Sequence, residues 1–312
     1  MTAAKVSLVI LTYNSERHLP ALLSSIQKQT YQPIEVIVVD NASQDGTVAW
    51  LEQQTILPDI QLIRNPQNDW FARGNNLGMQ AAHGEYIYIC NDDIVLTTTT
   101  IERLVRRLEQ SPANALVGGK MLKLIEGKPS HVIDSAGLVM YRSGRAVNRG
   151  EQEADTGQYD LAQPIFGITG AGMLLRRSAL TTIQHQPGEW FDNDFVAYKE
   201  DIDLSWRLRN AGYAVWYEPS AIIYHARTMQ QTSLASRPDK SSLIRALSYR
   251  NHLWLLCKNL TALELVKRLP WLLPYECAKL AYACLCEWST LRILPQTVVG
   301  IPRMLHKRYV RH

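Results

Sequence analysis

Several common signatures are missing from this 312-residue sequence, and each absence excludes a class of protein. No GxxxxGK[ST] loop occurs and no GxGxxG follows the first apolar run, so neither a phosphate loop nor a dinucleotide fingerprint is present. The glycines of "GITGAG", residues 167–172, come too late in the chain to serve as that fingerprint. The cysteines form no CxxC pair, so we expect reduced, buried thiols in a cytoplasmic protein: Cys90, Cys257, Cys277, Cys284 and Cys286.

The sequence also lacks a secretory signal peptide and an uninterrupted apolar run long enough to span a bilayer. Its start, "MTAAKVSLVILTYN", has one lysine and then an apolar stretch that is typical of a first strand. A membrane span needs about 20 apolar residues, and charged residues interrupt every such window near the C-terminus. We therefore expect any membrane contact to be peripheral, on the inner face of the cell membrane.

The charge is divided unevenly along the chain. Residues 240–312 hold 12 Lys and Arg and 3 Glu, a net charge of +9, whereas the remainder holds 21 Lys and Arg and 26 Asp and Glu, a net charge of −5. The basic tail is also rich in leucine and tryptophan. It is read either as an interfacial helical region with aromatic anchors, or as a helical cap with a solvated basic side. The asymmetry suggests that tail and body meet different partners, and no nucleic-acid partner is expected.

Strands and helices alternate through the first 110 residues. Short β-branched apolar runs predict strands, and apolar residues at helical spacing predict helices between them. This alternation predicts an α/β fold with a mostly parallel sheet flanked by helices, followed by a C-terminal helical appendage. The predicted strands are Val6–Thr12, Ile34–Asp40, Ile60–Asn65 and Tyr86–Cys90, and the predicted helices include 19–26, 76–82 and 101–108.

Polar side chains follow each predicted strand. In parallel sheets, ligands bind beyond the carboxyl ends of the strands, so these side chains are expected at one edge. Each has a plain alternative: a helix cap at Asn14, a turn in "NASQDGT", and an Asx turn in "NDD", residues 91–93. Their coincidence favours a ligand site. Without a phosphate loop, a bound nucleoside diphosphate would need a divalent cation held by carboxylates such as those of "NDD".

A second acidic cluster lies in "VAYKEDIDLSWRLRNAGY", residues 196–213. Its acids fall in the first turn of a predicted helix, where the helix dipole alone would favour them. The functional alternative is one carboxylate aimed into a cleft as a general base. Further on, His225 ends an apolar run and is either a structural histidine or a late metal ligand.

These motifs resemble the inverting glycosyltransferases of family 2, which have the GT-A fold, and most of all their rhamnosyltransferase-like branch. The resemblance runs in order through residues 6–226, with a looser match at "YRNHLWLLCKN" in the tail. It implies a glycosyltransferase domain at 1–230, with a nucleotide-sugar half (1–110) and an acceptor half (111–230), and a helical region at 231–312. The matching stretches are "VSLVILTYNSERHLPALLSSIQKQTYQPIEVIVVDNASQDGT", "NDWFARGNNLGMQAAHGEYIYICNDDIVL", "GITGAGMLLRRSAL" and "YKEDIDLSWRLRNAGYAVWYEPSAIIYHA".

The resemblance also implies a role for each matched residue. Asp201, in the "ED" element, would be the general base, and Asp93 and His225 would hold Mg²⁺ or Mn²⁺. One departure concerns Asn75, where relatives often carry an arginine for the diphosphate; Arg73 or Arg207 would have to replace it. The remaining roles are nucleotide-sugar binding by Thr12, Asn14, Asp40, Asn76, Asn91 and Asp92, and acceptor-side positions at Gly170, Gly172 and Glu200.

The predicted function is metal-dependent, inverting transfer of a sugar from a nucleoside-diphosphate donor, dTDP-rhamnose or a UDP-hexose, to a saccharide or lipid-linked acceptor. Two alternatives stay open. A catalytically retired carbohydrate- or nucleotide-binding protein would keep the fold but lose the acids. A sugar-nucleotide pyrophosphorylase would need a glycine-rich basic loop after the first strand, which "TYNSERHLP" does not provide.

Overall fold

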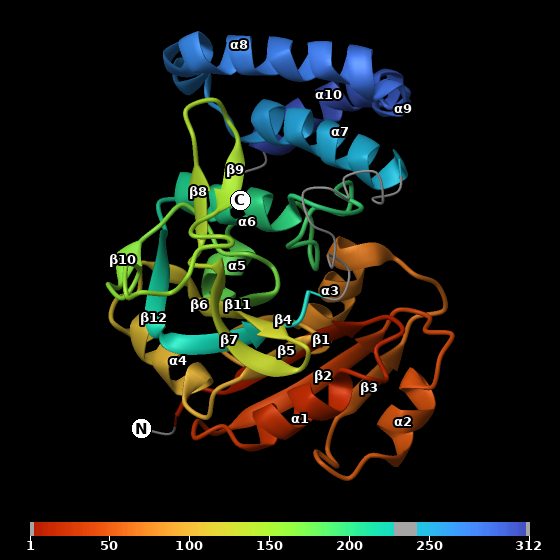
Figure 1. Cartoon of the computed structure of the whole chain (residues 1–312), viewed down its shortest axis with the longest axis vertical. Helices are drawn as coiled ribbons and strands as arrows, with labels where there is room; N and C mark the ends of the chain where they lie inside the picture. Colours follow the sequence, from red (N-terminus) through yellow and green to blue (C-terminus); the bar gives the residue numbers. More distant parts are fainter. Residues whose placement is uncertain (1–2, 228–241, 310–312) are drawn as a thin grey trace.

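The computed structural model describes residues 3–227 and 242–309 and shows one large mixed sheet with helices on both faces (Figure 1). The four N-terminal strands are parallel and stand in the order β4-β1-β2-β3. Because β1 and β2 pair from Val6↔Ile34 to Thr12↔Asp40, their carboxyl ends lie side by side. The predicted α/β fold is confirmed. The strand bounds are β1 Val6–Thr12, β2 Ile34–Asp40, β3 Gln61–Arg64 and β4 Tyr86–Asn91.

The helices between these strands are α1 (Leu19–Gln27), α2 (Thr47–Gln53), α3 (Trp70–Ala81) and α4 (Thr100–Glu109). Helix α3 begins six residues before the predicted start at Asn76. Its apolar stripe is weak because most of its buried residues are small or polar: Ala72, Gly74, Asn75, Asn76 and Gly78. A Cβ atom at Gly74 would lie 2.4 Å from Leu11 Cδ1, and the glycine lets α3 lie directly on β1.

The rest of the sheet is mostly antiparallel. Strand β11 is antiparallel to both β4 and β6, and β12 is parallel to β6 and antiparallel to β5. Side chains of β1 alternate between two buried clusters, with Val9 in one and Leu8 and Ile10 in the other, so both faces are covered. The bounds are β5 Ile94–Leu96, β6 Asn114–Ile125, β7 Lys128–Ser135, β8 Leu138–Met140, β9 Ala146–Asn148, β10 Gln163–Pro164, β11 Gly172–Arg176, α5 Arg177–Thr181, α6 Glu200–Asn210 and β12 Ala214–His225.

Four C-terminal helices form a layer at one end of the molecule, beyond α6 and the β8–β9 hairpin (Figure 1). A third buried cluster joins this layer to the sheet domain, because Trp254 and Leu255 pack with Phe195 and Trp206. This layer is the predicted helical appendage. The predicted division at residue 230 lies outside the described residues and stays a prediction. The helices are α7 Ser242–Asn259, α8 Ala262–Cys286, α9 Trp288–Leu291 and α10 Leu294–Tyr309.

Helix α8 differs from its neighbours in exposure. Of its 25 residues only Leu272 and Ala283 are buried, although many of the others are large and apolar. Across residues 3–227 and 242–309, no helix combines the length and apolar character needed to cross a membrane.

Candidate active site

The "NDD" segment brings a carboxylate and an imidazole together. Strand β5 pairs with the end of β12, which sets Ile94 opposite His225. His225 Nε2 consequently lies 3.1 Å from Asp93 Oδ1, and both side chains are less than a tenth exposed. On its other side, His225 Nδ1 lies 2.8 Å from Asp134 Oδ2. The two residues predicted as metal ligands therefore converge.

The charges around His225 favour its protonated form in this arrangement. Burial opposes protonation, but hydrogen bonds with Asp134 and Asp93 outweigh it and raise the pKa of His225 to about 9. A divalent cation would take the place of that proton. A histidine whose second nitrogen is fixed by a carboxylate is the arrangement usual for metal-bound histidines. The oxygen and nitrogen donors of Asp93 and His225, with Asp134 behind them, fit a Mg²⁺ or Mn²⁺ site.

The ends of β1 and β2 contribute the residues predicted to bind the nucleotide. Thr12 is buried opposite Asp40 in the strand register. The Asp40 carboxylate accepts a 3.2 Å hydrogen bond from the Ser43 backbone, which is the turn predicted as the plain alternative. Asn14 is exposed, has a positive φ of 54°, and accepts a 2.7 Å hydrogen bond from the Gln44 backbone. These residues occupy one edge of the sheet, as predicted.

Asp92 connects this edge to Asp93 and His225, the residues predicted as metal ligands. Its carboxylate accepts hydrogen bonds from the Ser15 hydroxyl and, at 3.3 Å, from the Tyr13 backbone. Burial raises the pKa of Asp92 to about 6, against the Ser15 hydrogen bond and with support from neighbouring Asp93. Asp92 thus holds the loop that follows β1, at Tyr13 and Ser15, against the "NDD" segment.

Asn76 has a different set of contacts from those predicted. Its side-chain amide donates to Phe191 O at 2.7 Å and to Asn193 Oδ1 at 3.0 Å, and its side-chain oxygen accepts from the Trp190 and Phe191 backbones. It is only 3% exposed. The structure therefore shows Asn76 holding the 190–193 loop, and a nucleotide contact stays a prediction.

Asp201 is the second residue of α6 and is half-buried. Its Oδ2 accepts a 3.1 Å hydrogen bond from the Gly170 backbone, and its Oδ1 accepts a 2.8 Å bond from the Ile202 backbone. Burial raises the pKa of Asp201, and these two N–H groups only partly oppose that effect. A carboxylate with a raised pKa is a stronger proton acceptor, which suits a general base.

A short turn joins this carboxylate to the end of β4. The Asn91 backbone N–H donates to Ala171 O at 3.1 Å, and the adjacent Gly170 N–H donates to Asp201. A Cβ atom at Gly170 would lie 2.6 Å from the Phe71 ring, so a side chain here would displace α3 contacts. The turn therefore holds Asp201 beside the strand end that carries "NDD".

The other two acceptor-side residues are buried. Gly172 begins β11 opposite Cys90, and a Cβ atom there would lie 3.0 Å from the Tyr88 hydroxyl, so packing accounts for this glycine. Glu200 is 7% exposed, and its Oε2 has no hydrogen-bond partner among the described residues. Burial, with nearby Asp201, raises the pKa of Glu200 well above its ordinary value. Acceptor contacts by these two residues stay predictions.

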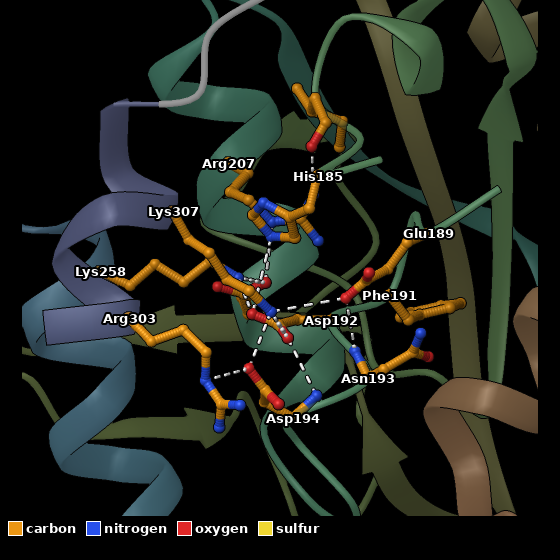
Figure 2. Close-up of polar contacts among 12 residues, drawn as sticks. His185, Glu189, Phe191, Asp192, Asn193, Asp194, Arg207, Lys258, Arg303 and Lys307 are labelled. Carbon is orange, nitrogen blue, oxygen red and sulfur yellow. Dashed lines mark hydrogen bonds and ion pairs between the residues drawn. The ribbon is translucent and has the colours of Figure 1, made fainter. Parts of the chain in front are cut away.

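A second acidic group, centred on Asp192, lies beside the candidate site. His185, Asp192 and Asp203 present ligand atoms within 4.8 Å of one another, a spacing that would suit a metal ion. Figure 2 shows that basic side chains surround Asp192 instead. Lys258 Nζ lies 2.6 Å from Asp192 and 2.8 Å from Asp203, and Lys307 also bonds Asp192. Because ammonium groups already neutralise these carboxylates, we assign the group as an ionic lock and not as a metal site.

The ionic lock corrects the expectation for Arg207 and bears on that for the basic tail. Arg207 was a candidate for the diphosphate contact, but it is 8% exposed and donates to Asp203 and to the Ile183 carbonyl. The Arg207 guanidinium is buried and already hydrogen-bonded, so it is not available to a diphosphate. Arg73 is exposed at the start of α3 and stays the candidate. In the basic tail, Lys258 and Lys307 pair with acids of the sheet domain, which fits the helical-cap alternative for these two lysines; an outside partner for the rest of the tail stays a prediction.

Sequence reasoning missed three further residues near the site: Asp134, Asn251 and Lys258. Asp134 gave no signal, because it lies in a strand distant in sequence from His225. Asn251 and Lys258 belong to "YRNHLWLLCKN", the one tail segment that resembled the family. Polar residues within that apolar segment were the available signal.

Comparison with known proteins identifies the family. An uncharacterized glycosyltransferase of Haemophilus influenzae is 31% identical over 140 residues, which cover 45% of this chain and 42% of that protein. The N-acetylglucosaminyl-diphospho-decaprenol L-rhamnosyltransferase of Mycobacterium tuberculosis is 26% identical over 244 residues, 70% of this chain and 74% of its own. This chain thus spans less than half of the Haemophilus relative's length.

A solved structure shows the same fold. The mannosyltransferase PcManGT from Pyrobaculum calidifontis, in complex with GDP-Man and Mn²⁺, matches with a TM-score of 0.58 at 18% identity, over 98% of this chain and 84% of its own. The description of glycosyl transferase family 2 matches residues 7–183. Since that segment is more than half of the chain, the protein belongs to glycosyl transferase family 2.

Proposed function

We propose that this chain transfers a sugar from a nucleoside-diphosphate donor to a hydroxyl of a saccharide or lipid-linked acceptor, with metal dependence and inversion. The observation that carries the proposal is the turn at 169–172, which bonds Asn91 at the end of β4 and Asp201 at the start of α6. It brings a donor-side strand end and a candidate base to the same edge of the sheet.

The donor side is assigned to the ends of β1, β2 and β4. Thr12, Asn14 and Asp40 would line the nucleotide pocket, and Asp93 and His225 would hold Mg²⁺ or Mn²⁺. When bound, the metal supplies positive charge that stabilises the departing diphosphate. Asp134 fixes the His225 ring through the 2.8 Å contact at Nδ1, which leaves Nε2 directed at Asp93.

The acceptor side depends on Asp201. The Gly170 and Ile202 backbone N–H groups orient its carboxylate, and burial raises its pKa so that it takes a proton more readily. Asp201 would remove the proton from the acceptor hydroxyl as that oxygen attacks the anomeric carbon. A single direct displacement inverts the configuration at that carbon. This reaction does not require the second carboxylate that glycoside hydrolysis uses.

The mycobacterial relative supports a choice of donor and acceptor. Its name describes L-rhamnosyl transfer to N-acetylglucosaminyl-diphospho-decaprenol, and the match covers 70% of this chain. We therefore propose dTDP-rhamnose as the first donor to examine, UDP-hexoses as the second, and a lipid-linked saccharide as the acceptor.

A lipid-linked acceptor fits the exposure of α8. Its large apolar side chains face solvent, among them Leu273 at 59% and Leu285 at 80%, and Trp288 just beyond it is 72% exposed. Lys267 in the same helix is exposed, and Arg268 and Lys279 are half-buried. An exposed helix with aromatic, aliphatic and basic residues is typical of one that lies in a membrane interface. We propose that α8 makes peripheral contact with an anionic lipid surface at the inner face of the cell membrane.

The activity is tested by incubating the protein with labelled nucleotide sugars and measuring nucleoside diphosphate release with Mn²⁺ and with chelator. Metal-dependent release is expected. Binding without release would favour the retired protein, and pyrophosphate release from a nucleoside triphosphate and a sugar phosphate would favour the pyrophosphorylase.

Asp201→Asn should abolish transfer while donor affinity stays within about twofold, since the base contacts only the acceptor proton. Exposed Asp59→Asn is the matched control. Retained turnover in Asp201→Asn would remove that residue from the role.

The lipid contact is tested by flotation with vesicles of anionic and of neutral lipid. The triple variant Leu273→Ser, Leu285→Ser, Trp288→Ser removes exposed apolar surface without opening the core, and it should lose flotation with anionic vesicles. Leu161→Ser, at a site 79% exposed in the sheet domain, is the control. If the triple variant floats as well as the parent protein, or if it instead loses a dimer seen by light scattering, the lipid assignment is wrong.

A further inference from the structure

The backbone just before Asp201 has an unfavourable conformation. Tyr198 and Lys199 have φ angles of 68° and 75°, the left-handed region that residues with a Cβ atom rarely adopt. Lys199 is the N-cap of α6 and supplies no side-chain capping bond. A turn of this kind persists only where its surroundings hold it. The position of Asp201 therefore depends on contacts from outside the turn.

Helix α7 supplies these contacts. Asn251 is fully buried, and its side-chain amide donates to Ala197 O at 2.8 Å and to Tyr198 O at 2.9 Å. Its side-chain oxygen accepts two 3.0 Å hydrogen bonds from Arg250, which fixes the orientation of the amide. Arg250 also donates to Asp194 O at 2.9 Å. Arg250 and Asn251 thus hold the loop before α6 at two places, Asp194 and residues 197–198.

The same helix holds the segments on both sides of the turn. Lys258 contacts Asp192, where the loop begins, and Lys258 and Asn259 contact Asp203 in the first turn of α6. Figure 2 shows Lys307 of α10 reaching Asp192 and Asp194 from the same side. Ionic contacts thus hold Asp192 before the turn and Asp203 after it. The side-chain amide of Asn251 bonds the backbone between them, at Ala197 and Tyr198.

We propose that Asn251 is a positioning residue for glycosyl transfer: it holds the left-handed turn at 198–199 so that Asp201 faces the acceptor hydroxyl. Asn251 acts through the carbonyls of Ala197 and Tyr198 and does not touch the substrate. The inference rests on the proposed role of Asp201 as the base. It extends the working site to the C-terminal helices, which lie outside the segment matched by the family description.

The test is Asn251→Asp, which keeps the shape of the side chain and the Arg250 contact but cannot donate to the two carbonyls. We expect kcat to fall about tenfold or more, because a displacement near 1 Å of a catalytic group costs on the order of 100-fold. Donor affinity should change less than about twofold, since the donor side is held by other strands. Amide exchange of residues 197–201 should accelerate.

Asn210→Asp is the matched control. Asn210 makes the same kind of contact between α6 and α7, from its side-chain amide to Asn259 O at 3.1 Å, but at the far end of α6. Its kcat should stay within about twofold. Asn251→Ser, which adds no charge and cannot span both carbonyls, serves if Asn251→Asp does not fold. Unchanged amide exchange at 197–201 in the folded variant would overturn the proposal. An inactive parent protein with accelerated exchange in the variant would instead overturn only the proposed function.

Discussion

Replacing Lys258 by methionine tests whether the C-terminal helices are an integral part of the folded enzyme. The Lys258 side chain is 1% exposed and contacts two carboxylates, Asp192 and Asp203, that are fully buried. Methionine keeps much of the volume and removes the charge. Among the described residues, Arg207 and Asn259 would remain on Asp203, and Lys307 would remain on Asp192.

The magnitude follows from burial. Breaking a buried ion pair by removing one partner costs about 3–5 kcal/mol, because the remaining charge is neither solvated nor neutralised. At roughly 2 °C per kcal/mol for a chain of this size, the melting temperature should fall by about 6–10 °C. Burial lowers the pKa of Lys258 although both carboxylates oppose it, and burial would raise that of Asp203, which Lys258 and Arg207 lower to about 2. Contacts of 2.6 and 2.8 Å between Lys258 Nζ and the two carboxylates are typical of a charged donor, so we treat Lys258 as protonated and both acids as ionised.

The assay is denaturant unfolding of the parent protein and of Lys258→Met between pH 3 and pH 7. Acids with a lowered pKa stabilise the fold above their ordinary value of 3.8, and this contribution is lost as the pH falls through the folded pKa. The gap between the two proteins should therefore be largest at neutral pH, should narrow below about pH 4, and should be lost only near the folded pKa of about 2.

Lys267→Met, at an exposed site of α8, is the matched control and should change stability by less than about 0.5 kcal/mol. If Lys258→Met unfolds like the parent protein at pH 7, the ionic lock contributes no stability and the reasoning is wrong. A gap that stays constant down to pH 3 would show that the loss comes from packing and not from charge.

Two more predictions concern buried groups at the site. Glu200→Gln should stabilise the protein increasingly as the pH rises above about 4.5, by about 1.4 kcal/mol per pH unit, because the folded state holds the Glu200 proton after the unfolded state has released it. Urea unfolding at pH 5 and pH 7 measures this, and equal gains at both pH values would contradict it. Asp134→Asn should weaken Mn²⁺ binding about 10–100-fold, since it removes the charge that orients His225. Calorimetric Mn²⁺ titration checks this against Asp59→Asn, and equal affinities would refute it.

The N-terminal strands and their ends could be predicted from the sequence because both depend on local pattern. Strand β2 was predicted to the residue, and β4 lacked only Asn91. The start of α3 was missed because Gly74, which packs against Leu11 of β1, has no side chain. The first turns of this helix therefore lack the apolar spacing that predicts a helix. The pairing of Asp93 with His225 was predicted from the family resemblance and not from spacing.

The contacts around Asp192 could not be predicted, since they join residues far apart in sequence. Lys258 is 66 positions from Asp192, and Asp134 is 91 positions from His225. Charge counting found the basic tail and left both an outside partner and a packed helical cap open; it could not show that Lys258 and Lys307 pair with acids of the sheet domain. Segment composition gives the sign of a charge and not the place where it is neutralised.

The third buried cluster has a practical consequence for anyone who shortens this protein. A chain cut at residue 230 would keep every residue assigned to the donor and the base, and would look complete beside the family match at 7–183. It would nevertheless expose Phe195 and Trp206, which now pack against α7, and would leave Asp192 and Asp203 without their lysine. Such a fragment should aggregate when expressed, and its failure would carry no information about the chemistry.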